Sequence, residues 1–421
     1  MGEERTTQSI LVVGGGMSGT TAAIEAAEAG YDVILVEKNP YLGGRVAQLH
    51  QYFPKLCPPQ CGLEINFKRM KQSPNVRFFT MSEVESISGQ AGNFEVTIKT
   101  RPRYVNENCT ICGKCGEVCE LMIDNPFDYG MSKIKAAYLP HDLAFPARFV
   151  LAPEIIGTED AKRCFEACAY NAIDLAMQAK MFTLNVGAIV WAAGWEPYDA
   201  SKIEYYNFNQ CSNVITNVMM ERLAAHSGPT GGKILRPSDG KPVQSIAFVQ
   251  CAGSRDENHL PYCSDICCMA SLKQATYLRT QNPDSKATIF FIDIRAMDRL
   301  EDFYVKVKED PNVTFIKSKI ASITQDPESG NVILEGEDTM SAEKIRVEAD
   351  LAVLATGMVP STAKAKVPAA VAYDAYGFIP SDSAVPGIIS VGTGKRPSDV
   401  SACVQSGTAA ALKAIQIIAR R

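Results

Sequence analysis

The sequence has no run or stripe of basic residues. Its net charge of −5 and isoelectric point near 5.6 give no reason to expect a nucleic-acid partner. No apolar run approaches the roughly 20 residues that span a bilayer. The first nine residues are acidic and polar, unlike a secretory signal. We therefore expect a cytosolic protein.

The chain is long enough for two or three domains, because 421 residues with 46% hydrophobic and 21% charged content are ordinary for globular proteins. Its fourteen cysteines are too numerous to be packing residues alone, and most fall in three tight clusters. In a reducing compartment such clusters hold metal or carry out redox chemistry more often than they form disulfides. The cysteines therefore bear directly on function.

Residues 10–37 combine an apolar run, a glycine-rich turn, an alanine-rich segment and a second apolar run that ends in an acid. The order predicts strand, turn, helix and strand. In this dinucleotide-binding fingerprint the glycines permit a tight turn, close approach of a pyrophosphate and close helix packing, while the acid accepts from ribose hydroxyls. The acid favours a dinucleotide with a free 2′-hydroxyl. The predicted contact residues are Gly14, Gly16, Met17, Ser18, Gly19 and Glu37.

Three further segments extend this site and favour a flavin dinucleotide over NAD. Residues 38–45 place two glycines and an arginine shortly after the ribose acid, residues 186–194 form a buried strand that ends in small residues, and residues 387–394 lead through a glycine turn into an alanine-rich helix. An acidic residue often occupies the place of Gly392 and Thr393, so the contact with the ribityl–phosphate region stays open. The predicted FAD contacts in these segments are Lys38, Gly44, Arg45, Ala193, Gly194, Gly392 and Thr393, and Gly357, which ends a similar apolar run, is predicted as a further contact.

A cysteine run in the middle of the chain has the spacing by which bacterial ferredoxins hold iron–sulfur clusters. It reads Cys109-x2-Cys112-x2-Cys115-x3-Cys119, and Cys164-x3-Cys168 is similar to the end of a second run. The two remaining cysteines of that second run would lie at positions 158 and 161, which are Thr and Ala here. The spacing therefore predicts one cluster on Cys109, Cys112, Cys115 and Cys168, and the loss of the other.

The strand segments of the first unit are echoed later in the chain. Residues 245–249 resemble residues 9–13, residues 287–293 resemble the run that ends at Glu37, and residues 349–357 resemble residues 186–194. We predict an α/β fold with two Rossmann-like units of the FAD/NAD(P)-binding, disulfide-reductase type and a ferredoxin-like insertion. The predicted segments are 1–104, 181–205 and 358–421 for the FAD-binding domain, 105–180 for the iron–sulfur insertion, and 206–357 for the second, degenerate NAD-like domain.

The second unit lacks the glycine fingerprint that would bind NAD(P). Four cysteines occupy the phosphate-loop region and the start of the next helix instead: Cys251, Cys263, Cys267 and Cys268. This pattern indicates a thiolate cage in place of a nucleotide cradle.

Cys57 and Cys61 lie near the expected flavin, separated by two prolines and a glutamine. They could form a redox-active disulfide, although such pairs are spaced more widely on a helix in pyridine-nucleotide disulfide reductases, or they could have a cluster-binding or structural role. The sequence leaves both interpretations open.

Together with residues 229–233 and 236–241, these motifs resemble HdrA, the flavin subunit of heterodisulfide reductase. The resemblance implies FAD, a [4Fe–4S] cluster on the Cys251 to Cys268 group close to the flavin, and Lys273 close to the reactive end of the isoalloxazine. A second [4Fe–4S] cluster in the insertion is possible.

Among HdrA-like proteins the chain is similar to the QmoA group, which belongs to the quinone-interacting membrane-bound oxidoreductases of sulfate reducers. That similarity implies electron transfer between adenylylsulfate reductase and a membrane menaquinol-oxidising haem subunit, beside a second flavin and iron–sulfur subunit, at the cytoplasmic side of the inner membrane. The alternative is an NAD(P)H-dependent thiol–disulfide oxidoreductase that uses Cys57 and Cys61. The missing second fingerprint favours electron transfer.

Overall fold

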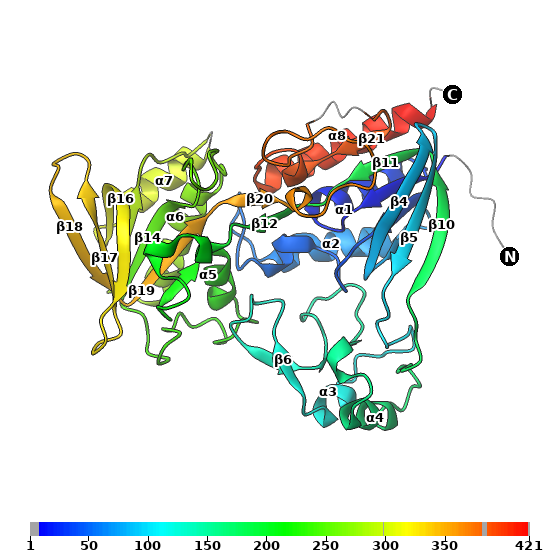
Figure 1. Cartoon of the computed structure of the whole chain (residues 1–421), viewed down its shortest axis with the longest axis horizontal. Helices are drawn as coiled ribbons and strands as arrows, with labels where there is room; N and C mark the ends of the chain where they lie inside the picture. The colour runs from blue at the N-terminus through cyan, green and yellow to red at the C-terminus, as the bar shows by residue number, and fades with distance from the viewer. Residues whose placement is uncertain (1–7, 298, 381–384, 420–421) are drawn as a thin grey trace.

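The computed structural model describes residues 8–297, 299–380 and 385–419. Two Rossmann-like units lie at opposite ends of the molecule, and a small insertion projects from one of them (Figure 1). The first unit has a five-stranded parallel sheet of order β21-β11-β1-β2-β3. Its strands are β1 (Ile10–Val13), β2 (Val33–Val36), β3 (Val76–Phe79), β11 (Ala188–Trp191) and β21 (Ile388–Ser390).

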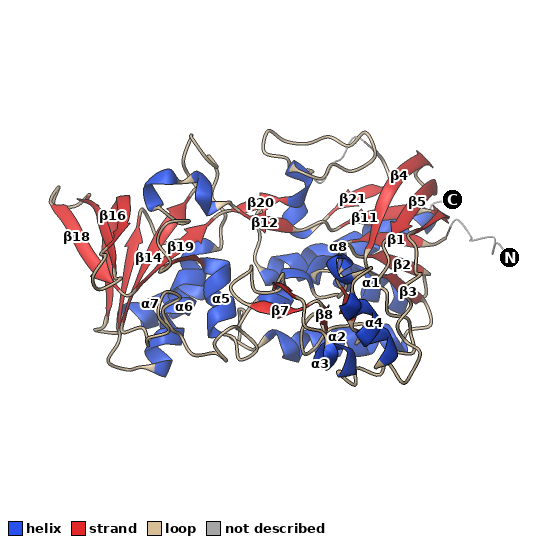
Figure 2. Ribbon diagram, turned by 60° about the horizontal axis from the view of Figure 1, so that its bottom comes forward, coloured by secondary structure: helices blue, strands red, loops and turns tan. Residues whose placement is uncertain are grey.

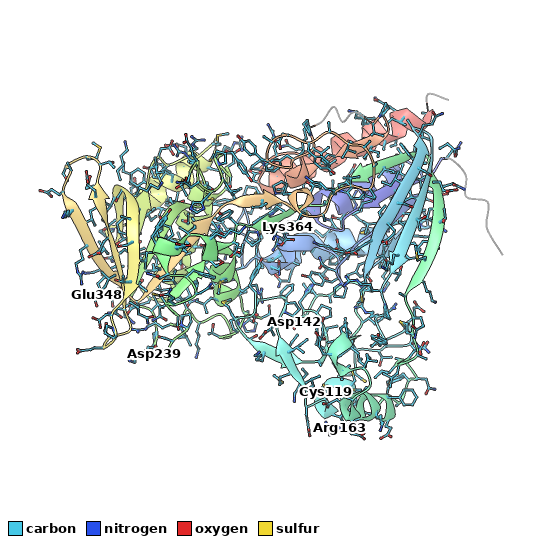
Figure 3. All side chains as sticks on the ribbon, viewed as in Figure 1. Cys119, Asp142, Arg163, Asp239, Glu348 and Lys364 are labelled. Atoms are coloured by element: carbon cyan, nitrogen blue, oxygen red, sulfur yellow. The ribbon has the colours of Figure 1, made fainter. Side chains whose placement is uncertain are left out.

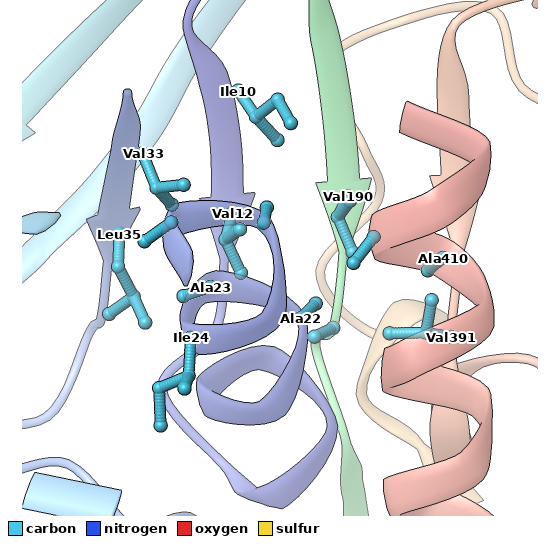
Figure 4. Close-up of a cluster of buried hydrophobic side chains, with 14 of the residues drawn as sticks. Ile10, Val12, Ala22, Ala23, Ile24, Val33, Leu35, Val190, Val391 and Ala410 are labelled. Atoms are coloured by element: carbon cyan, nitrogen blue, oxygen red, sulfur yellow. The ribbon is translucent and has the colours of Figure 1, made fainter. Parts of the chain in front are cut away.

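Helices cover one face of this sheet, and the small residues that face it let a helix pack closely there. In α1 (Met17–Glu28), alanines and Ile24 are buried against β1 and β2, as Figure 4 shows. Helix α2 (Pro59–Gln72) adds Leu63, Phe67 and Met70 to the same core. Alanine lets helix and sheet approach closely, so the N-terminus of α1 is held firmly at the end of β1.

Helix α8 (Val400–Ala419) completes this layer. Among the described residues it is the helix that is long and apolar enough to cross a membrane, by length and composition. The expectation that no apolar run approaches the length of a membrane span is corrected here. In this fold it packs against α1 and β11 and contributes Ala410, Ala414 and Ile418 to the core (Figure 4). Its position is that of a core helix of the first unit.

An antiparallel sheet covers the other face of the first unit. It has the order β10-β5-β4, from β4 (Ser82–Gln90), β5 (Asn93–Thr100) and β10 (Lys180–Val186). Phe94, Val96 and Ile98 of β5 are buried against Leu11 and Ile34 of the parallel sheet. The apolar alternation of β5 is typical of a half-buried strand, whereas the polar strand β4 lacks such a pattern.

The insertion leaves the first unit after β5 and returns at β10. It has a core of its own, formed by small apolar residues and by Cys119 and Cys164. Cys119 and Arg163 lie at the end that points away from both Rossmann-like units (Figure 3). Its elements are α3 (Lys114–Val118), β6 (Met122–Asp124), β7 (Lys133–Lys135), β8 (Ala137–Tyr138), β9 (Val150–Leu151) and α4 (Glu159–Glu166).

The second unit has a seven-stranded sheet of order β13-β19-β14-β15-β16-β17-β18. Strands β13 to β16 in this order are parallel, and β17 and β18 extend the sheet antiparallel. Helices α5 (Asn217–Ala224), α6 (Cys267–Gln281) and α7 (Leu300–Lys308) lie side by side against it (Figure 2). The strands are β13 (Val214–Thr216), β14 (Ser245–Ala252), β15 (Lys286–Phe291), β16 (Val313–Gln325), β17 (Val332–Asp338), β18 (Lys344–Ala349) and β19 (Leu351–Thr356).

Two short strands carry the chain between the units. Strand β12 (Trp195–Pro197) runs toward the second unit and pairs antiparallel with β20 (Met358–Pro360), which returns. Ala200, Ile203 and Tyr206 already pack in the core of the second unit. The crossing therefore lies at β12, before the boundary that we predicted at residue 205.

Candidate functional site

The glycine turn after β1 has the geometry that its sequence predicts. Gly14 has φ +105°, and a Cβ there would lie 2.2 Å from the Ala192 carbonyl oxygen. A Cβ on Gly19 would lie 1.9 Å from the Gly14 carbonyl oxygen. A Cβ on Gly16, in contrast, would meet only the Gly44 Cα, at 3.9 Å. Gly14 and Gly19 therefore permit close packing, whereas Gly16 borders open space at the N-terminus of α1.

The predicted ribose acid is fixed by the same turn. Glu37 is buried, and its carboxylate accepts hydrogen bonds from the backbone N–H groups of Gly15 (2.6 Å) and Asn39 (2.7 Å). Burial raises the pKa of Glu37, and the two backbone donors oppose that effect. The acid is thus oriented at the carboxyl end of β2, where the fingerprint requires it.

Other predicted flavin contacts converge on the N-terminus of α1. A Cβ on Gly44 would lie 2.8 Å from the Gly16 Cα, and a Cβ on Gly392 would lie 2.1 Å from the Ser18 hydroxyl. A Cβ on Gly394 would lie 3.7 Å from the Ser390 hydroxyl and 4.0 Å from the backbone nitrogens of Ala193 and Gly194, and the neighbouring Thr393 is buried. Segments far apart in the chain thus meet where backbone N–H groups and a helix dipole favour a pyrophosphate. The residues fit a dinucleotide.

Lys38 and Arg45 point toward the crossing strands. Both approach the carboxylate of Glu196, Lys38 at 3.5 Å, and Arg45 also donates to the Trp195 carbonyl oxygen (2.6 Å). Both positive charges are therefore paired with the Glu196 carboxylate on β12.

Met17, another predicted flavin contact, packs at the edge of the core of the first unit.

Gly357 lies elsewhere than predicted. It follows β19 in the second unit, where a Cβ would come within 2.2 Å of the Ser254 hydroxyl and 2.9 Å of the Ser264 hydroxyl. Its small size makes room for the cysteine-bearing loop and not for the fingerprint of the first unit. The echo of residues 186–194 in residues 349–357 is correct for the strand, but the two strands belong to different sheets.

The four cysteines of the second unit meet at the carboxyl edge of its parallel strands. Cys251 ends the regular part of β14 with φ 56°, and Cys267 and Cys268 begin α6. Cys263 comes from the loop between them. Each of Cys251, Cys267 and Cys268 is close enough to the others for their charges to interact, and burial is the main reason that their thiol pKa values are raised. Such buried thiols ionise readily only when a metal centre binds them.

Within the described residues no three His, Cys, Asp or Glu side chains converge on a single metal ion. A [4Fe–4S] cluster binds each cysteine through a different iron, so its ligands need not converge in that way. The chemistry of this donor set, four thiols and no carboxylate, fits such a cluster.

Lys273 reaches across the interface between the units. Its buried ammonium group donates to the Gln51 carbonyl oxygen of the first unit (2.5 Å) and pairs with Glu221 of α5 (3.0 Å). The same carboxylate accepts from the backbone N–H of His50 (3.0 Å) and the hydroxyl of Tyr277 (3.1 Å). Glu221 and His50 were missed from the sequence, because no motif connects residues on three separate segments.

Four of the six cysteines of the insertion share a pocket, and the other two are buried beside it. Cys109, Cys112, Cys115 and Cys168 line one small pocket together with Phe149 and Ile173. Cys119 and Cys164 lie outside that pocket and are completely buried in the core of the insertion. Burial raises the pKa of Cys115 and of Cys164 to about 12.

The residues at the two missing ligand positions, Thr158 and Ala161, have structural roles. The Thr158 side chain caps α4 by accepting from the Ala161 N–H (3.4 Å), and the Ala161 side chain is buried beside Cys164. Both residues therefore support the helix, and the pocket shared by Cys109, Cys112, Cys115 and Cys168 is where the insertion fits one cluster.

Cys57 and Cys61 are free thiols at the beginning of α2, Cys57 partly exposed and Cys61 exposed. The prolines do not prevent a helix here, since Pro58 precedes it and Pro59 is its first residue, where proline is tolerated. Both sulfurs lie near the Tyr52 hydroxyl.

Known proteins resemble the chain in fold and in sequence. Thioredoxin reductase from Lactococcus lactis covers 98% of this chain and is itself covered completely, with a TM-score of 0.54 and 13% identity. The bacillithiol disulfide reductase of Bacillus cereus gives a TM-score of 0.53 with 12% identity, over 98% of this chain and 99% of the reductase. The sequence profile of the FAD-dependent oxidoreductases matches residues 9–57.

Curated relatives are more similar in sequence. An HdrA iron–sulfur subunit of CoB–CoM heterodisulfide reductase from Methanopyrus kandleri is 38% identical over 98% of this chain, and the HdrA protein of Methanocaldococcus jannaschii is 37% identical over 96%. The HdrA protein of the H2:CoB–CoM heterodisulfide, ferredoxin reductase from Methanothermobacter thermautotrophicus is 33% identical over 97%. The chain spans 65%, 63% and 64% of the lengths of these three proteins.

Two Rossmann-like units in this order, with the fingerprint in the first, define the FAD/NAD(P)-binding fold of the disulfide reductases, and the predicted fold class is confirmed. The matches to the family profile and to the curated relatives indicate an oxidoreductase subunit. The chain is an HdrA-like protein, homologous to the HdrA subunits of heterodisulfide reductases over nearly its whole length.

The different surroundings of Gly16 and Gly19 predict different failures. Gly16→Val should fold but bind no FAD, because its side chain would project into the open space at the helix N-terminus. Gly19→Val should lose stability by about 1–3 kcal/mol or fail to fold, since its Cβ overlaps the Gly14 carbonyl. Flavin absorbance per protein and thermal melts, compared with flavin-free wild type, measure both effects. Full flavin content in Gly16→Val would contradict the assignment.

The grouping of the insertion cysteines predicts unequal effects on iron content. Cys112→Ser should lose about four iron atoms per chain, because Cys112 lines the pocket that fits a cluster. Cys119→Ser should keep its iron, since Cys119 lies outside that pocket. Iron and acid-labile sulfide analyses measure the difference, with a thermal melt to verify that each variant folds. Equal losses in the two variants would show that the ligand set is wrong.

Proposed function

We propose that the chain is the FAD-binding, iron–sulfur electron-transfer subunit of a heterodisulfide-reductase-like complex. The observation that carries this proposal is the replacement of a nucleotide-binding loop by four thiols in the second unit, at the carboxyl edge of its parallel strands. In open α/β sheets that edge is where ligands bind. The thiols therefore occupy the place that NAD(P)H would need.

FAD, when bound, would supply the conversion between two-electron and one-electron steps. The open space at Gly16 would hold its pyrophosphate at the N-terminus of α1, the tight turn at Gly14 and the close packing at Gly19 would position that helix end, and Glu37 would orient the ribose. The thiols of Cys251, Cys263, Cys267 and Cys268 would hold a [4Fe–4S] cluster. The pocket of Cys109, Cys112, Cys115 and Cys168 would hold a second one.

Lys273 and Glu221 connect the thiol group of the second unit with the predicted flavin site of the first unit. Lys273 lies about 1.4 turns beyond Cys268 on α6. It donates a hydrogen bond to the carbonyl oxygen of Gln51, in the loop that follows Gly44 and Arg45. The helix that carries two of the cluster thiols is therefore attached directly to the loop beside the predicted flavin site. Its ammonium group would also favour a negatively charged flavin.

A more specific assignment is to the QmoA group. In that assignment the complex passes electrons between adenylylsulfate reductase and a membrane menaquinol-oxidising haem subunit during dissimilatory sulfate reduction. The chain would lie on the cytoplasmic side of the inner membrane, held there by partner subunits. The loss of two ligand cysteines from the insertion supports this proposal. Thr158 and Ala161 stand at the sequence positions where the second ferredoxin-type cluster would have its ligands.

Removal of one thiol should separate cofactor binding from electron transfer. Cys267→Ser should lose about four iron atoms per chain and transfer electrons to adenylylsulfate reductase poorly, while FAD remains bound. Cys211→Ser is the matched control, because Cys211 is a buried free cysteine of the same unit outside the thiol group. Iron content, flavin absorbance and electron transfer are measured on the complex. Full iron and full transfer in Cys267→Ser would reject the proposal.

The buried ion pair predicts how the flavin responds to a loss of charge. Lys273→Met should keep its iron and shift the flavin midpoint potential downward, because the negative charge of Glu221 loses its partner. The double variant Lys273→Met with Glu221→Gln removes both charges and should shift the potential less. Absorbance-monitored redox titrations compare the three proteins. Equal potentials in all of them would place Lys273 outside the electrostatic reach of the flavin.

A further inference from the structure

Three charged side chains form a group beside the thiols of the second unit. Asp293 follows β15 and pairs with Arg255 on one carboxylate oxygen and with Arg295 on the other, at 3.5 Å. Arg255 comes from the loop after β14. We refer to Arg255, Asp293 and Arg295 as the arginine collar.

The collar hydrogen-bonds Cys268 and Cys251, and its charges reach Cys263. The Asp293 backbone carbonyl accepts from the Cys268 thiol at 3.6 Å, and the Arg295 backbone N–H also faces that sulfur. Among the charges that raise the pKa of Arg295, the Cys263 thiolate has the largest effect. Burial raises the pKa of Cys251 to about 11, while the charge and hydrogen bonding of Arg255 act in the opposite direction.

The collar lies on the open side of the thiol group. The side chains of Arg255, Arg295 and Asp293 are 25%, 42% and 47% exposed. Cys267, in contrast, is buried and its thiol donates to the Thr356 carbonyl oxygen at 3.6 Å. Water and a partner protein can therefore reach the collar side chains more readily than they can reach Cys267.

Asp293 lies at the position in the second unit where a dinucleotide-binding unit carries its ribose-binding acid. Asp293 corresponds in the second unit to Glu37 in the first, since both acids follow the second strand of a strand–helix–strand unit. Glu37 is held by backbone N–H groups beside a glycine turn. Asp293 is held by two arginines beside thiols, so the position that would bind ribose now carries paired charges.

Other charges near the thiols are arranged as pairs. Lys319 is bound to Asp256 at 2.8 Å, and Asp265 is near Arg295. The charge of Lys319 also reaches Cys251, whereas Arg255 acts on Cys251 by both charge and hydrogen bonding and Arg295 acts on Cys263. Since reduction of a cysteine-bound cluster adds one negative charge, a nearby cation stabilises the reduced form and a nearby anion destabilises it.

We propose that the arginine collar sets the reduction potential of the centre held by Cys251, Cys263, Cys267 and Cys268, with Arg255 and Arg295 raising it and Asp293 lowering it. This inference rests on the proposed function, because it requires a cluster at these thiols. It assigns to three residues a role that their pattern along the chain does not show. Arg255, Asp293 and Arg295 are positioning residues in this role, since they act on the centre through its ligands.

The test is a redox titration of the purified complex, followed by electron paramagnetic resonance of the reduced cluster. Arg255→Gln and Arg295→Gln should each lower the midpoint potential. Arg295→Lys, which keeps the charge, should leave it close to the wild-type value. Asp293→Asn should raise it, because both arginines then act without the opposing carboxylate.

Arg346→Gln is the matched control, since Arg346 pairs with Glu335 on the antiparallel extension of the same sheet and should leave the potential unchanged. Unchanged potentials in Arg255→Gln and Arg295→Gln, or a shift of Asp293→Asn in the same direction as theirs, would overturn the role of the collar and leave the proposed function intact. Absence of this cluster signal and of its iron from the wild-type complex would overturn both.

Discussion

A buried ion pair between Lys273 and Glu221 joins the two Rossmann-like units. Burial of two charges costs several kcal/mol per ion unless each has good hydrogen-bond partners. The Glu221 carboxylate accepts hydrogen bonds from Gln274 and Tyr277 of α6 and from the backbone N–H of His50. The Lys273 ammonium group donates to the carbonyl oxygen of Gln51. Because two of these partners are backbone groups of the first unit, the pair is complete only when the loop after Gly44 lies against α6.

The two units share one topology but differ in what the carboxyl edge of the sheet presents. In the first unit Gly14 and Gly19 permit a tight turn and close helix packing, and Gly16 leaves open space at the N-terminus of α1, which suits a phosphate. In the second unit cysteines begin the corresponding helix, and the acid at the end of the second strand binds arginines. The exchange of a few residues at one edge thus changes the chemistry while the strand order and the helices remain.

The insertion shows how a ligand site is lost without loss of the fold around it. Where two cysteines would complete the second ferredoxin-type site, Thr158 caps α4 and Ala161 packs against Cys164. Apolar side chains then surround Cys119 and Cys164, and the two sulfurs are buried among them. A cap and a methyl group therefore stabilise the helix that ligands would otherwise hold in place.

The sequence alone determined the local features: the fingerprint of residues 10–37, the absence of a second one, and the cysteine spacings, since neighbours along the chain decide turns and ligand spacing. It also indicated the paired units, because apolar strand segments recur in the same order. Only the tertiary structure decided which edge Gly357 faces, that the chain crosses between units at β12, and that Glu221 and Asp293 have partners on other segments. Those contacts join residues far apart in the chain, and side-chain packing selects them, which local pattern does not encode.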